Sequence, residues 1–218
     1  MTAVPSRRHP GGRAPDPAKD EAILLAARRC FFERGFLATT IEEVAGRANV
    51  SKVTVYKRFG TKEALFEATV KAEMADMARR LAEHPDVGGP LGRRLDAFGL
   101  VLMRFLFSPR HMLLDRMLAQ DFAHTPALAR RFFDLGPGAC RARLGAVLAE
   151  AAGAGEIEID DPLLAAADLF ALWRGFLEKE LEFGVIPHAD EEGLRHRVER
   201  GTRLFLRMAR PAGLEPAT

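Results

Sequence analysis

The chain has 218 residues, of which 48% are hydrophobic and 28% charged, and its formal net charge at pH 7 is +2. This length allows one well-buried core, or a small module attached to a larger one. No apolar run reaches the roughly eighteen residues that a membrane span requires, so we expect no membrane partner.

Charge is distributed unevenly along the chain. Residues 1–62 hold 12 Lys and Arg against 6 Asp and Glu, whereas the remainder holds 20 against 24. A basic front end on an acidic body favours a polyanion as partner of the front end alone, although a merely solvated basic face has the same composition. Cys30 and Cys140 lie far apart without CxxC spacing, which predicts buried thiols and a cytoplasmic location.

The first helix is expected to begin after a basic arm. Residues 1–15 are rich in Pro and Gly, and no apolar stretch follows their paired arginines, so we expect disorder rather than a secretory signal. Asp16 before Pro17 predicts a helix start, and Gly35 can adopt the positive φ that ends this helix. Its apolar face is predicted to consist of Ile23, Leu24, Ala27, Cys30 and Phe31.

Two short helices and one long helix are expected next. Thr40 and Glu43 fit a capping box, and Asn49 is suited to a positive φ at the end of the first short helix. Ser51 can cap the second short helix, whose inner edge would consist of Val53 (or Val50), Tyr56 and Phe59. Gly60 closes it, and Thr61 opens the long helix.

The rest of the chain also has helical periodicity. A break from His84 to Pro90 is a predicted hinge. Further helices are expected near residues 91–107, 109–123, 126–135, 138–152, 162–184 and 190–210. We therefore predict an all-α fold, with a three-helix helix-turn-helix domain over residues 16–62, a dimerising helical bundle over 63–210 and a flexible tail over 211–218.

Residues 20–66 resemble the DNA-binding domain of the TetR/AcrR family of transcriptional regulators. The chain departs from the family pattern at Asn49, which replaces a glycine, at Val44, Val53 and Val55, and at Arg58, where His or Tyr is common. The matching positions are Phe32, Arg34, Gly35, Thr39, Thr40, Ala45, Ala48, Val50, Ser51, Thr54, Tyr56, Phe59, Lys62 and Leu65.

The resemblance implies that double-stranded DNA is the partner of this domain. Thr40, Tyr56 and Lys62 would contact phosphates, although the Tyr56 ring could instead be mostly core. The base edges would be read by Glu42, Lys52, Val53 and Thr54. Ser51, Lys57 and Arg58 complete the predicted interface, the last two as generic phosphate contacts or solvated side chains.

The bundle is expected to form a homodimer. Residues 162–184 are apolar on nearly every side, so a partner subunit would cover the face that its own subunit leaves open; a monomer with a deeply buried central helix is the alternative. The predicted interface consists of Leu163, Ala167, Phe170, Arg174, Leu177, Leu181, Val198 and Phe205.

The resemblance also implies a pocket for a small apolar effector. His111, Asp121 and His124 could orient such a ligand, and these residues have no metal-ligand spacing. The predicted lining, which could equally be plain core, consists of Met103, Phe107, Met112, Met117, Phe122, Phe133, Trp173 and Phe176.

We therefore expect a repressor released from a palindromic operator by its effector, with no cofactor and no enzymatic activity, since no catalytic motif occurs. The alternative is a DNA-binding protein without an effector, which acts architecturally or under the control of a protein partner.

Overall fold

The computed structural model describes residues 17–84, 86 and 88–209, which form eleven α-helices and no strand. The predicted all-α fold is confirmed; the predicted arm, the Asp16 cap and the predicted tail from Pro211 lie outside the described residues. The helices are α1 (Pro17–Ala38), α2 (Ile41–Arg47), α3 (Lys52–Phe59), α4 (Lys62–Ala82), α5 (Leu91–Leu106), α6 (Pro109–His124), α7 (Pro126–Leu135), α8 (Pro137–Gly153), α9 (Pro162–Arg174), α10 (Leu177–Glu182) and α11 (Glu191–Met208).

The short N-terminal helices begin at the predicted caps. Thr40 and Glu43 form the capping box of α2, in which each side chain accepts a hydrogen bond from the other residue's N–H at 3.3 Å. The hydroxyls of Ser51 and Thr61 cap α3 and α4. Asn49, with φ 52°, makes the turn between α2 and α3. These helix boundaries depend on contacts within four residues, which explains why the sequence predicts them.

One predicted helix is interrupted. The expected helix over 162–184 breaks at Gly175, whose φ of 48° ends α9, and the chain resumes as the short helix α10. Among the described residues, no single helix is long and apolar enough to cross a membrane; α5 and α6 pass such a test of length and composition only as a pair bent by 66°.

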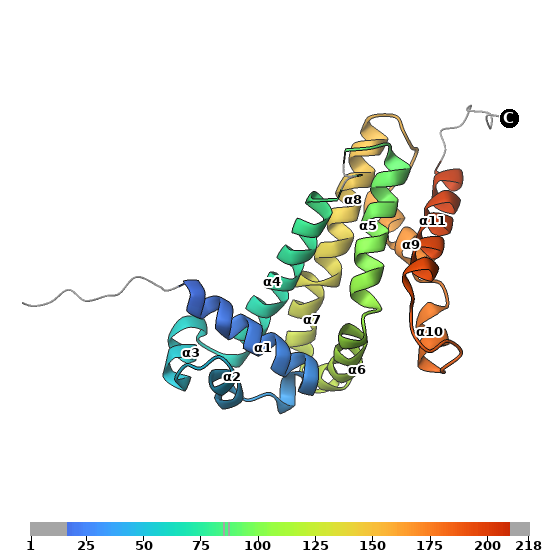
Figure 1. Cartoon of the computed structure of the whole chain (residues 1–218). Coiled ribbons are helices and arrows are strands. Elements are labelled where there is room, and N and C mark those ends of the chain that lie inside the picture. The colour runs from blue at the N-terminus through green and yellow to red at the C-terminus, as the bar shows by residue number, and fades with distance from the viewer. Residues whose placement is uncertain (1–16, 85, 87, 210–218) are drawn as a thin grey trace, which may run out of the picture.

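Three helices form a head at one end of a helical bundle. Figure 1 shows α1, α2 and α3 grouped together, with α4 leading from them along α7 and α8. Helices α5, α9 and α11 pack on one another on the side of the bundle away from the head. Helix α6 lies below α5 and packs against α1, so α4 and α6 make the main contacts between the bundle and the head.

The head does not have a hydrophobic core of its own. Its buried residues, from Ile23 to Val55, form one cluster with Leu65 and Phe66 of α4, Leu114 and Leu118 of α6, and Leu128 of α7. A boundary at residue 62 therefore marks the end of the three-helix motif but does not divide the core.

The second core is centred on Trp173, the single tryptophan of the chain. Its ring is buried, and its Nε1 donates a hydrogen bond to Thr202 Oγ1 at 3.1 Å. Glycines on two neighbouring helices make room for it. A methyl group on Gly99 of α5 would lie 2.8 Å from Trp173 Cε2, and one on Gly201 of α11 would lie 2.7 Å from Trp173 Cδ1.

This packing predicts that Gly99→Ala and Gly201→Ala each lower the free energy of unfolding by about 1 to 3 kcal/mol, because the added methyl overpacks the core. Gly153→Ala at the end of α8 is the matched control, since nothing lies within 4 Å of its added methyl. Urea denaturation measures all three. Equal stability of the three variants would contradict the packing described for Trp173.

Candidate DNA interface and bundle cavity

Helix α3 presents one exposed face to solvent. Lys52, Val53, Tyr56 and Lys57 follow one another at helical spacing and are all exposed, Val53 at 74% and Tyr56 at 44%. The expectation that Val53 and Tyr56 belong to an inner edge was wrong: Val55 is the buried residue of α3, at 1% exposure, and Phe59 and the predicted alternative Val50 pack against the head core. Val53 and the Tyr56 ring are therefore free to touch a partner.

Two of the residues predicted to read bases are paired with each other. Lys52 Nζ donates a hydrogen bond to Glu42 on α2, and the same bond raises the pKa of Lys52 and lowers the pKa of Glu42. Both side chains are half-exposed, so solvent screens the pair and separating it costs little. DNA could therefore compete for Lys52 without disturbing the fold.

Several predicted contact residues also hold the head together. Thr40 and Ser51 are helix caps, and the Ser51 hydroxyl lies 2.8 Å from Thr54 Oγ1. Arg58 forms an ion pair with Asp20 of α1. Each of these side chains already has a structural role, and its contact with DNA remains a prediction.

Lys62 is the residue whose placement differs most from its predicted role. Its Nζ donates to the carbonyl oxygens of Phe36, Leu37 and Thr39 at 2.9, 3.2 and 3.0 Å, and it lies 4.4 Å from the centre of the Phe36 ring. Burial lowers the pKa of Lys62. Because these bonds use all three ammonium donors, a phosphate contact through Nζ would require one of them to be exchanged.

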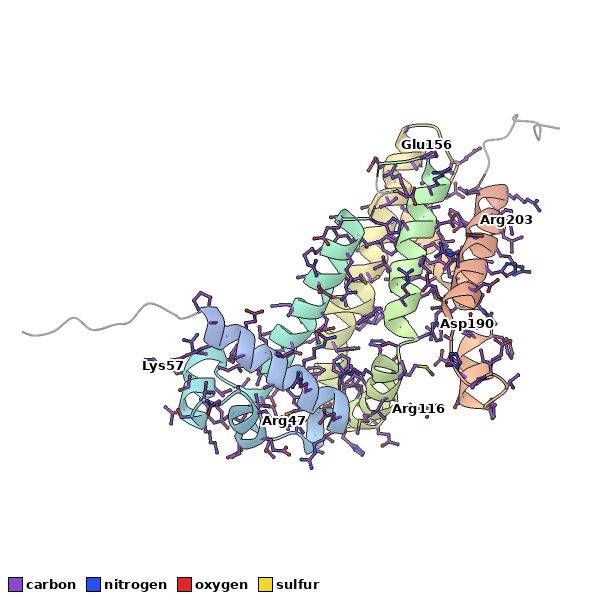
Figure 2. All side chains as sticks on the ribbon, in the orientation of Figure 1. Arg47, Lys57, Arg116, Glu156, Asp190 and Arg203 are labelled. Atoms are coloured by element: carbon purple, nitrogen blue, oxygen red, sulfur yellow. The ribbon has the colours of Figure 1, made fainter. Side chains whose placement is uncertain are left out.

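The exposed cations of the head are well placed for a polyanion. Figure 2 shows Lys57 on the side of the head that faces away from the bundle. A short helix with hydroxyls, amines and one exposed apolar side chain on its outer face can enter the major groove of a duplex.

The bundle contains a cavity of about 420 Å³. Helix α1 and each of the helices from α4 to α10 contribute to its wall. Eight aromatic rings line it: Phe31, Phe32, Phe66, Phe105, Phe107, Phe132, Phe170 and Trp173. Such a volume and lining suit a small, largely apolar molecule.

The structure places four of the eight predicted lining residues on the wall of this cavity and the other four elsewhere. Met103, Phe107, Met112 and Trp173 line the cavity. Phe122 instead packs against the head core, and Met117 lies beside Gly35 of α1. Phe133 and Phe176 are exposed, at 47% and 74%. These four were wrong because composition and spacing do not show which side of a helix faces a cavity.

Polar groups lie at defined points of the cavity wall. Glu73 of α4 is paired with Arg28 of α1 at 2.9 Å, and burial raises its pKa. His111 lines the cavity, with its Nε2 3.5 Å from Asp115 and its Nδ1 buried without a hydrogen-bond partner among the described residues. His124 and Asp121 do not line the cavity, and Asp121 instead binds the end of α1.

The predicted dimer residues divide into two groups. Leu177, Val198 and Phe205 are buried within the subunit, at 3% exposure or less, so their assignment to an interface was wrong. Leu163 and Arg174 are exposed, and Ala167, Phe170 and Leu181 are half-buried. The large apolar side chains exposed on or next to α9, α10 and α11 are Leu163, Leu164, Phe176, Phe183, Val185 and Met208.

Sequence reasoning missed the cavity residues that come from the head and from α4. Phe31 and Phe66 belong to helices assigned to DNA binding or to its boundary, so no local signal linked them to a ligand. The described residues contain no group of three or more His, Cys, Asp or Glu side chains placed to hold a metal ion.

Two family models match the chain. The model of the tetR family of bacterial regulatory proteins matches residues 23–69, and the model of the AefR-like transcriptional repressor C-terminal domain matches residues 93–209. Together they cover the head and most of the bundle. The matched families and relatives are transcriptional regulators and not enzymes.

Individual relatives agree with the family models. The chain is 37% identical over 109 residues to an HTH-type transcriptional repressor of Mycobacterium tuberculosis, a match that covers 49% of this chain and 56% of that relative. A solved structure, the Flavonoid-responsive Regulator FrrA, is 32% identical with a TM-score of 0.74 over 91% of this chain and 100% of that one. A TetR-family regulator from Mesorhizobium loti shares the fold at 24% identity, with a TM-score of 0.74 over 91% of this chain and 100% of that one.

The buried His111 predicts a dependence of stability on pH. Burial lowers its pKa below the ordinary value of 6.5, against the opposing effect of Asp115 and with a smaller contribution from Arg174. The folded state then binds fewer protons than the unfolded state, so stability is complete above pH 6.5 and is lost as the pH falls towards the lower, folded pKa.

Between pH 7.5 and 5.5, as measured by urea denaturation, His111→Leu should therefore lose less free energy of unfolding than the unsubstituted protein, because it lacks the buried group whose protonation destabilises the folded state. His196→Leu, at an exposed position of α11, should follow the unsubstituted protein. Identical pH profiles for all three would show that His111 is not held neutral by burial.

Proposed function

The chain belongs to the TetR family of bacterial transcriptional regulators, and from that premise we propose that it is a homodimeric repressor that binds a palindromic operator in the cytoplasm and leaves it when a small aromatic molecule enters the bundle. The observation that carries the proposal is the outer face of α3, where Lys52, Val53, Tyr56 and Lys57 are all exposed, whereas Val55 of the same helix is buried in the head core.

The chemistry of this face supports sequence-specific DNA binding. Lys52 can donate to guanine, and Val53 can pack on a thymine methyl group. Lys57 and the Tyr56 hydroxyl can contact phosphates, which position the helix without reading sequence. One helix of eight residues reads only a few base pairs, so two copies related by twofold symmetry are needed for a longer site.

Exposed apolar side chains support the homodimer. Leu164, Phe176, Phe183 and Val185 are each more than 60% exposed; Leu164 lies on α9, Phe176 and Phe183 flank α10, and Val185 lies in the loop that follows. Several exposed large apolar side chains within one stretch of the chain favour an interaction site there, and a second copy of the chain is the partner typical of the family.

The cavity supports a planar aromatic effector with polar substituents. Its eight aromatic rings suit stacking, while Glu73 and His111 offer polar atoms to hydroxyl groups. Flavonoids are planar, polyhydroxylated aromatics, and FrrA, described as flavonoid-responsive, is 32% identical over 91% of this chain. We therefore propose hydroxylated aromatic compounds of this size as the effector class.

The DNA-binding proposal predicts a palindromic consensus when bound sequences are selected from random duplex DNA, with two subunits on each site. In shift assays, Lys52→Ala should relax the preference at one base position, because it removes a base contact. Lys57→Ala should weaken all sequences alike and reduce the slope of log affinity against log salt by about 1, since it removes a phosphate contact.

Lys71→Ala, an exposed lysine in the middle of α4, is the matched control and should leave both properties unchanged. If Lys52→Ala and Lys57→Ala behave identically, the division into base and phosphate contacts is wrong. If the protein ignores duplex DNA at low salt, the proposed function fails.

The effector proposal predicts that the flavonoid quercetin quenches Trp173 fluorescence, after correction for its absorption, and weakens operator binding by about tenfold or more. Met112→Trp, which narrows the cavity, should abolish binding in calorimetry. Leu113→Trp, the neighbour on α6 that does not line the cavity, should not. Operator binding that quercetin and other small aromatics leave unchanged would favour a DNA-binding protein without an effector.

A further inference from the structure

The end of α1 is bound by a single carboxylate from α6. Asp121 Oδ2 accepts hydrogen bonds from the backbone N–H of Phe36 at 2.6 Å and of Leu37 at 3.0 Å. Gly35, with φ 79° and ψ −178°, interrupts the helical backbone of α1 just before these two amides. A carboxylate that accepts two backbone N–H bonds forms a strong, directional contact. Here it joins two helices that lie about 85 residues apart in the sequence.

The side chains of Asp121 and Met117 lie directly against the backbone of α1 at this point, because Gly35 has no side chain. A methyl group on Gly35 would lie 2.8 Å from Asp121 Oδ2 and 3.2 Å from Met117 Cβ. Such distances leave no room for α6 to slide past α1. A movement of α6 is therefore either followed by the end of α1 or breaks the two hydrogen bonds.

The same segment is bound on its carbonyl side by α4. Lys62 Nζ donates to the carbonyl oxygens of Phe36, Leu37 and Thr39, and the Thr39 hydroxyl donates to the Gly35 carbonyl at 2.7 Å. We call residues 36–39 the linker segment; two of its N–H groups, on Phe36 and Leu37, are bound by α6, and three of its C=O groups are bound by Lys62 of α4. Thr40, the cap of α2, follows at once, so the linker segment sets where α2 and α3 lie.

Helix α6 is also a wall of the cavity. Met112, Asp115, Arg116 and Ala119 line the cavity at helical spacing, whereas Met117 and Asp121 lie at the contact with α1. Figure 2 shows Arg116 on α6. One rigid helix therefore has the cavity along one face and the linker segment on another.

We propose that Asp121 is the positioning residue through which the occupancy of the cavity controls the placement of α2 and α3. This inference rests on the proposed function, since it assigns to one carboxylate the link between ligand and DNA. A ligand that displaces α6 pulls on the N–H groups of Phe36 and Leu37, and hydrogen bonds tolerate displacements of only a few tenths of an ångström. The linker segment moves with Asp121, and α2 and α3, which follow it in the chain, move with the linker segment.

The test is a double-mutant cycle on operator affinity that needs no ligand. Met112→Trp fills part of the cavity and stands in for an occupant. On its own, Met112→Trp should change operator affinity by about tenfold. When Asp121→Ala is also present, Met112→Trp should change it by no more than about twofold, because the hydrogen bonds between α6 and the linker segment are then missing. The matched control is Gln120→Ala, an exposed neighbour on α6, in whose background Met112→Trp should keep its full effect. Equal effects of Met112→Trp with and without Asp121 would overturn the proposal.

Two further variants separate this link from a merely structural role. Asp121→Asn should preserve the effect of Met112→Trp, since its amide oxygen can accept both hydrogen bonds. If Asp121→Ala fails to fold, amide hydrogen exchange is compared between the unsubstituted protein and Met112→Trp, both of which keep Asp121. Met112→Trp should change the exchange rates of residues 35–40 more than those of α8. No change there would overturn the proposal.

The failure of this inference can be told from the failure of the proposed function. If the unsubstituted protein binds no operator DNA at all, the proposed DNA recognition is refuted. Operator binding that responds to quercetin equally in the unsubstituted protein and in Asp121→Ala would leave the proposed function standing and would refute the role of Asp121.

Discussion

The structure depends on one cluster of buried aromatic rings between head and bundle. Phe66 of α4 packs edge-on against Phe31 of α1, with ring centres 5.0 Å apart, and against Phe36 at 5.4 Å. On its other side it stacks on Phe132 of α7 at 5.9 Å. Because aromatic pairs of this kind bury large areas in fixed geometries, the head cannot rotate on the bundle without repacking its own core.

This constraint explains how a cavity in the bundle can influence a helix at the other end of the head. Phe31 and Phe66 belong both to the core that holds α3 and to the wall of the cavity. Close-packed cores respond to an occupant by shifting between discrete arrangements rather than by deforming gradually. The hydrogen bonds of Asp121 and Lys62 then determine which part of the head follows such a shift.

Prediction from the sequence succeeded where the determinants are local. The caps Thr40, Ser51 and Thr61 bond to residues within four positions, and Asn49 takes its φ from its own chemistry, so the motif and the helix bounds could be read directly. Prediction failed where the outcome depends on how a helix is oriented or on residues far away in the sequence. Val53 and Val55 are the same residue type, and only the packing of the head shows which one is buried. The partners of Lys62 and Asp121 lie more than twenty residues away, and no periodic pattern predicts them.

The central claim is that α3 enters a DNA groove from a head whose position the linker segment sets. The structure of the protein bound to duplex DNA carrying its selected operator tests this claim most directly. The account predicts α3 inside the major groove, Lys52 and Thr54 facing base edges, and Asp121 still bound to the amides of Phe36 and Leu37. A complex in which the duplex lies on another surface and α3 faces solvent would contradict it.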